Sequence, residues 1–134
     1  MFNEATILIY FTQICLGIQY LHHNNLVHKE LRPKSIYLDD QHASVDYLGS
    51  EDLIPILRRN TSLVMRYPIY DAPKNVDGEE YTLKSNIWSL GIILYELCAF
   101  SHPFKAPTNV EVDRNILIGS YPHFRKFFLL RSLI

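Results

Sequence analysis

The stretch HKELRPKS, residues 28–35, gathers several side chains that could do chemistry. The carboxylate of Glu30 could accept a proton, the guanidinium of Arg32 could bind phosphate as a fork, and the hydroxyl of Ser35 could bind magnesium. A further carboxylate, Asp46, follows after another short apolar run. The stretch lies between two apolar segments, so a folded chain would hold these groups beside its core. Residue types alone leave open whether the cluster reacts.

The segment before this cluster predicts an α-helix over residues 4–22. Asn3 is a suitable N-cap, and the asparagines of HHNN at 22–25 tolerate the left-handed conformation that ends helices. Gly17 is unfavourable in a helix interior. Apolar residues recur at steps of three and four, the spacing of one helical face, at Ile7, Phe11, Ile14, Ile18 and Leu21.

The segment after the cluster predicts a β-hairpin. Two short apolar runs, 36–38 and 43–46, flank DDQH at 39–42, whose composition suits a turn. Residues 48–73 then show no sustained period and contain three prolines, which indicates an irregular loop with one short helical turn near 51–58.

Residues 84–100 predict a helix that is apolar on every side, with Ser85 as its N-cap and the dipeptide His102-Pro103 as its stop. A helix of this kind must be wrapped by other elements, so we expect it at the centre of the domain.

The rest of the chain predicts two more helical segments. One runs over 109–118 and ends at Gly119, and the tail at 124–134 reads as the start of another. No composition shift or repeat divides the chain, so residues 1–134 are expected to form one mainly α unit with a short β-hairpin.

The length, composition and net charge of the chain fit a folded domain. The chain has 134 residues, of which 48% are apolar, and a net charge of −1, which argues against nucleic-acid and membrane-surface partners. No window reaches the roughly 20 apolar residues of a membrane span; the nearest candidate is 87–100, which carries Glu96. Cys15 and Cys98 fall in apolar helical patterns, which favours free thiols in an intracellular, cytoplasmic setting over a disulfide.

Four segments resemble protein kinase motifs and occur in that family's order. HKELRPKSIYL at 28–38 is similar to the catalytic loop H-R-D-L-K-P-x-N, VDYLG at 45–49 to the D-F-G motif, RYPIYDAPK at 66–74 to the end of the activation segment, and YTLKSNIWSLGIILYELCAFSHPF at 81–104 to the buried helix S-D-I-W-S-L-G. FTQICLGIQYLH and ILIGSYP most resemble the NIMA-related Ser/Thr kinases. The resemblance implies an incomplete kinase large (C-terminal) lobe over 1–134, with the small lobe expected before Met1 and the last helices absent.

The resemblance also implies roles for four residues. Glu30 stands where the family has the aspartate that accepts the substrate's proton, and Arg32 where a lysine contacts the transferring phosphoryl group. Ser35 replaces the asparagine that binds the second Mg²⁺, and Asp46 is the counterpart of the D-F-G aspartate that binds magnesium. Mg-ATP is therefore the implied cofactor, although we do not expect this chain to bind it alone. An exposed glutamate, a surface arginine and a structural serine are the alternative readings.

The positions that depart from the family's pattern are those with chemical roles in the family, whereas the apolar residues of the fold match that pattern. Glu30 is one methylene longer than aspartate, which displaces its oxygens by about 1 Å, enough to cost on the order of 100-fold in rate. The other departures are Lys29 for arginine, Leu48 for the D-F-G glycine, Arg66 and Tyr67 for Gly-Thr, Lys74 for the A-P-E glutamate, and Asn86 for a buried aspartate.

Three functions follow as hypotheses. The first is a degenerate kinase-like domain, a pseudokinase lobe that binds a protein partner or acts as a scaffold. The second is a fragment of an active Ser/Thr protein kinase whose small lobe is missing from this chain, with Glu30 as the base and Asp46 on the metal. The third is an unrelated helical domain. Whether the chain is an enzyme stays open.

Overall fold

The computed structural model describes residues 2–47 and 68–122. Its elements are α1 (Glu4–His23), a 3₁₀ turn η1 (Pro33–Ser35), β1 (Ile36–Leu38), β2 (Ala43–Val45), a second 3₁₀ turn η2 (Pro68–Tyr70), α3 (Pro73–Val76), α4 (Leu83–Ala99) and α5 (Asn109–Ile118). The expected mainly α fold with one hairpin is confirmed. Several predictions lie outside the described residues: those for Leu48, Gly49, Arg66, Tyr67, the turn near 51–58 and the tail at 124–134.

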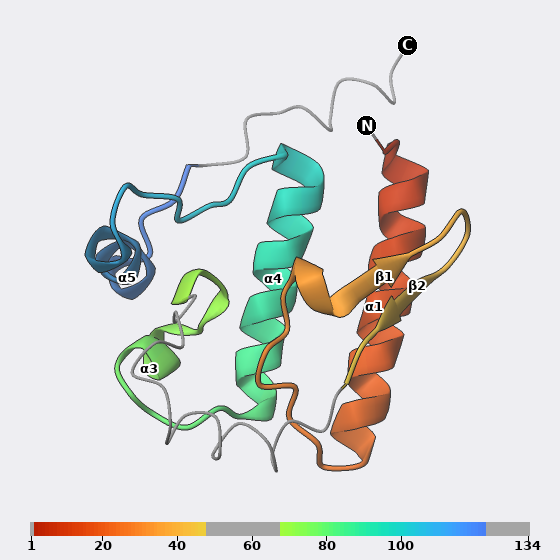
Figure 1. Cartoon of the computed structure of the whole chain (residues 1–134), viewed down its shortest axis with the longest axis horizontal. Coiled ribbons are helices and arrows are strands. Elements are labelled where there is room, and N and C mark those ends of the chain that lie inside the picture. Colours follow the sequence, from red (N-terminus) through yellow and green to blue (C-terminus); the bar gives the residue numbers. More distant parts are fainter. Residues whose placement is uncertain (1, 48–67, 123–134) are drawn as a thin grey trace.

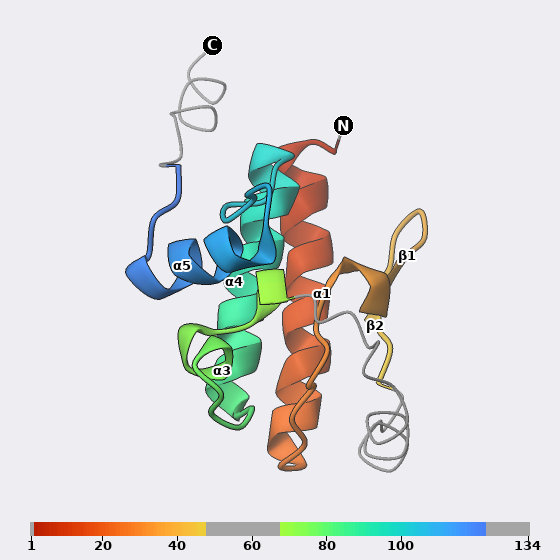
Figure 2. The same cartoon turned by 60° about the vertical axis from the view of Figure 1, so that its left-hand side comes forward.

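Two long helices, α1 and α4, run side by side and carry the other elements (Figure 1). The hairpin β1–β2 lies against α1, while α3 and α5 lie beyond α4 (Figure 2). The charged loop at 28–35 connects the end of α1 to the hairpin and passes beside α4. This arrangement holds the loop between the two main helices and the hairpin.

The first helix forms as its sequence predicts. The side-chain oxygen of Asn3 accepts a hydrogen bond from the Thr6 N–H at 2.8 Å, which caps the helix start. At the other end, Asn25 adopts a left-handed backbone with φ of 56°, and Asn24 donates to the Tyr20 carbonyl. The chain therefore reverses directly before the charged loop.

The start of α4 corrects one expectation. The N-cap is Thr82, not Ser85, and the hydroxyl of Ser85 accepts a hydrogen bond from the Thr82 N–H at 3.0 Å. Ser85 thus sits in the first turn and supports the cap from inside the helix. The helix ends at Ala99, one residue before the predicted end at 100, and Phe100 caps it in a left-handed conformation with φ of 52°.

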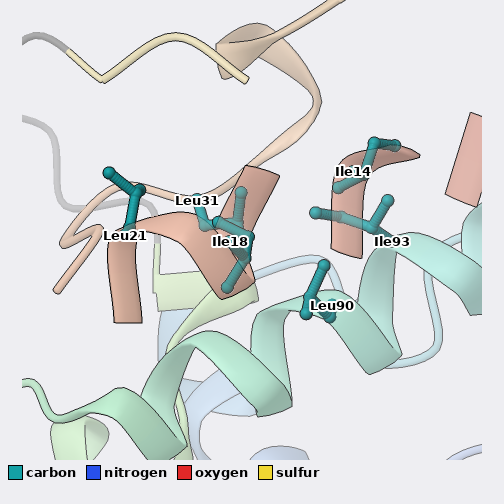
Figure 3. Close-up of a cluster of buried hydrophobic side chains, with 6 residues drawn as sticks. All are labelled: Ile14, Ile18, Leu21, Leu31, Leu90 and Ile93. Atoms are coloured by element: carbon teal, nitrogen blue, oxygen red, sulfur yellow. The ribbon is translucent and has the colours of Figure 1, made fainter. Parts of the chain in front are cut away.

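The main core joins three parts of the chain. Ile14, Ile18 and Leu21 of α1 form one buried cluster with Leu90 and Ile93 of α4 and with Leu31 of the charged loop (Figure 3). All six are buried, so the loop is fixed to the core by its own leucine. The expectation that α4 is wrapped on every side holds only in part, because Ile87 is 53% exposed.

The hairpin forms as predicted and packs closely on α1. Ile36 pairs with Val45 and Leu38 with Ala43 in an antiparallel register. A Cβ built on Gly17 would lie 3.4 Å from a methyl carbon of Val45. Glycine at this place in α1 therefore lets the strand approach the helix closely.

A second cluster fixes α5 against the far side of α4. It joins Ile92 and Phe104 to Val112 and Ile116. As predicted, α5 ends at Gly119, whose φ of 65° belongs to the left-handed region.

By length and composition alone, α1 could cross a membrane, contrary to the expectation that no segment is long and apolar enough. The core helix of a soluble protein passes the same test. In this structure α1 buries five side chains within the domain: Ile7, Tyr10, Ile14, Ile18 and Leu21.

Candidate functional site

His28 anchors the start of the charged loop. Its ring nitrogen Nε2 lies 2.8 Å from the Asp46 carbonyl oxygen, and its Nδ1 accepts a hydrogen bond from the Glu30 N–H at 3.3 Å. Burial lowers the pKa of His28, although the bond to the Asp46 carbonyl opposes this shift. These contacts fit a neutral imidazole with its proton on Nε2. The histidine is thus a packed structural residue.

Asn86 on α4 holds the same loop by its backbone. Its side-chain oxygen accepts from the His28 N–H at 3.0 Å, and its amide nitrogen donates to the His28 carbonyl. The oxygen also lies 3.1 Å from Nε2 of His22 at the end of α1. Only 1% of Asn86 is exposed, so these bonds are shielded from water. The amide ties α1, the loop and α4 together at one point.

The two predicted catalytic residues lie together on the exposed side of the loop. A nitrogen of the Arg32 guanidinium lies 3.4 Å from a carboxylate oxygen of Glu30, and the two side chains are 32% and 50% exposed. An ion pair of this exposure contributes little to stability. It does bring the candidate base and the candidate phosphate-binding group next to each other.

Ser35 faces the backbone of its own turn. Its hydroxyl donates to the Arg32 carbonyl at 2.8 Å and accepts from the Arg32 N–H at 3.1 Å. A serine hydroxyl has one donor and two acceptor positions, so this turn uses the donor and one of the acceptors. The residue predicted to bind magnesium is therefore engaged in closing η1.

Asp46 lies next to Ser35 at the base of the hairpin. The Asp46 N–H donates to the Ser35 carbonyl at 2.8 Å, which places the two predicted magnesium ligands at the same end of the two strands. Asp46 is half-buried, so its carboxylate keeps access to water. Within residues 2–47 and 68–122, no group of three or more His, Cys, Asp or Glu side chains is placed to hold a metal ion.

These residues do not supply the ligands of two magnesium ions. Magnesium demands octahedral oxygen coordination and usually takes one or two carboxylates along with phosphate oxygens and water. Asp46 fits such a role, whereas the hydroxyl of Ser35 is held by the backbone of Arg32. The described part of the site therefore fits at most one metal ion, through Asp46.

A tyrosine–glutamate pair beside the loop was not predicted as part of the site. The Tyr70 hydroxyl donates to a carboxylate oxygen of Glu96 at 2.9 Å. Burial raises the pKa of both groups, and for Tyr70 the negative charge of Glu96 raises it further. The positive charge of Arg32 lowers the pKa of Tyr70 and so partly opposes this shift. Sequence gave no signal for this contact, because the two residues are 26 positions apart.

Glu96 of this pair lines a groove of about 600 Å³ beside the loop. Its wall is mostly apolar and includes Pro33, Ile36, Leu38, Ile93, Glu96 and His102. The groove lies between the hairpin and the last turns of α4.

Lys74 forms a local ion pair. Its ammonium nitrogen lies 3.4 Å from a carboxylate oxygen of Glu79, and both side chains are well exposed. A pair of this kind is worth little in water. The family's glutamate at this position is thus replaced by a lysine that pairs with a neighbour in the chain.

The protein kinase domain model matches residues 1–126. The chain is 37% identical to the probable serine/threonine-protein kinase nek3 of Dictyostelium discoideum, over 99% of this chain and 12% of that protein. It is 38% identical to the mouse serine/threonine-protein kinase Nek3, over 79% of this chain and 21% of the relative. For mouse Nek5 the identity is 34%, over 100% of this chain and 22% of the relative. The chain thus spans between about a tenth and about a fifth of these relatives' length.

Proposed function

Since this chain belongs to the protein kinase family, with relatives among the Nek-type Ser/Thr kinases, we propose that it is a degenerate kinase-like domain. In this proposal the domain binds a protein partner and does not transfer phosphate. The fold residues of the family are kept, and the polar residues of the charged loop are used for other contacts.

The observation that carries the proposal is the position of the Ser35 hydroxyl. It is bonded on two sides to the backbone of Arg32, so its direction is set by the closure of η1 and only one acceptor position is left for a metal ion. Magnesium is reluctant to leave its water shell and requires well-placed oxygens. A serine held in this way is a poor replacement for an asparagine side chain, which is longer.

The pair formed by Glu30 and Arg32 supports the same proposal. In the structure the guanidinium lies against the carboxylate that would have to accept a proton. That carboxylate oxygen is therefore already in contact with a cation of its own loop. The longer side chain of glutamate adds a displacement of about 1 Å, which costs on the order of 100-fold where geometry determines the rate.

Binding of a protein partner is supported by apolar surface next to the loop. Tyr37 is 60% exposed and Leu38 is 42% exposed, and the groove described above begins at Leu38. Exposed apolar area with a polar rim is typical of protein interaction sites.

The proposal is tested by thermal unfolding of the full chain with MgCl₂ alone, ATP with EDTA, and Mg-ATP. We expect the same melting temperature in all three, together with no transfer of labelled phosphate to a generic basic protein. The control is the variant Asp46→Ala, which removes the one side chain that fits the metal. A stabilisation that needs both Mg²⁺ and ATP and disappears in Asp46→Ala would overturn the proposal.

A second candidate is favoured by the coverage of the relatives, since the chain matches only 12% to 22% of their length. In this case the chain is part of a longer Ser/Thr protein kinase, and Glu30 and Asp46 keep their family roles once the rest of the kinase domain is present. Reading the coding sequence upstream of Met1 distinguishes the two. A glycine-rich loop followed by an alanine-x-lysine strand would favour the active kinase.

A further inference from the structure

We draw no further inference here: the strongest candidate, the apolar groove between the hairpin and the last turns of α4 that Ile36, Leu38 and Ile93 line, belongs to the candidate site already described, and nothing in residues 2–47 and 68–122 shows what covers it.

Discussion

The amide of Asn86 does something that the family's aspartate cannot do. It accepts a hydrogen bond from the His28 N–H and donates one to the His28 carbonyl, so it satisfies both backbone groups of one residue. A carboxylate could accept but could not donate, and it would carry a charge into a buried place. The loss of a charge-assisted bond is therefore offset in this chain by an additional bond.

Restoring the family residue at this position is thus expected to weaken the fold. Asn86→Asp would set a carboxylate oxygen against the His28 carbonyl without a hydrogen between them. We expect this variant to lose about 1–3 kcal/mol of the free energy of unfolding, the typical cost of an unsatisfied buried acceptor. Urea denaturation measures it, with Asn109→Asp at the exposed start of α5 as the control. Equal stability of Asn86→Asp and the native chain would contradict the assigned bonds.

His102 makes stability depend on pH. Burial lowers its pKa to about 4, partly opposed by the Ile69 backbone, and Nδ1 accepts from the Phe104 N–H at 3.1 Å. The folded pKa lies below the unfolded value near 6.5, so the unfolded chain binds the proton more readily. Stability from this residue is complete above pH 6.5 and declines as the pH falls toward 4.

The variant His102→Asn isolates this effect, since an asparagine oxygen can accept from Phe104 but does not titrate. We expect the native chain to lose on the order of 1 kcal/mol more than the variant between pH 6.5 and 4, allowing for solvent screening of a partly exposed ring. His28 stays in both chains and adds the same slope to each. Parallel stability curves for the two chains would show that His102 does not contribute.

At the scale of elements, the contact between α1 and β2 depends on Gly17. Its position against Val45 leaves room for one methyl group at ordinary contact distance and for nothing larger. Alanine is better than glycine in a helix by about 1 kcal/mol. We therefore expect Gly17→Ala to be neutral or more stable, and Gly17→Leu to lose about 1–3 kcal/mol through overpacking. Guanidinium denaturation of both variants checks this, and a Gly17→Leu variant as stable as Gly17→Ala would refute it.

Local sequence patterns predicted the helices and strands correctly, but they predicted the exact end residues of these elements less well. The period of α1, the turn of the hairpin and Gly119 at the end of α5 are signals within a few residues, and they predicted the structure correctly. Thr82 and Ser85 are both good capping residues, so composition could not decide between them. The end of α4 was predicted to within one residue, but the left-handed backbone of Phe100 was not, because a bulky residue rarely adopts that conformation.

The sequence predicted which residues of the candidate site lie in one region, but it did not predict the contacts of their side chains. The motif order brought Glu30, Arg32, Ser35 and Asp46 into one region, as the structure has them. It could not show that Ser35 turns to its own backbone, since that depends on the conformation of η1. The pair of Tyr70 and Glu96 was missed because it joins a loop to a helix through tertiary packing.

The whole molecule combines a well-ordered interior with much apolar surface. The clusters around Ile18 and Ile116 are buried, yet large apolar side chains stay exposed on several elements. Among the described residues these include Leu16, Tyr20, Tyr37, Leu38, Ile87 and Phe100. Tyr37 and Leu38 of β1 place part of this exposed surface on the hairpin.

This open surface leads to a prediction for the hairpin. We expect the purified chain to bind the dye ANS and to aggregate on heating, because the exposed residues of β1 can associate between molecules. Tyr37→Ser combined with Leu38→Ser should lower dye binding and increase the fraction that refolds after heating. Val110→Ser is the matched control, since Val110 is 78% exposed but lies on α5, away from the hairpin. A native chain that melts sharply and reversibly at low concentration would contradict this expectation, and so would equal effects of the hairpin and control substitutions.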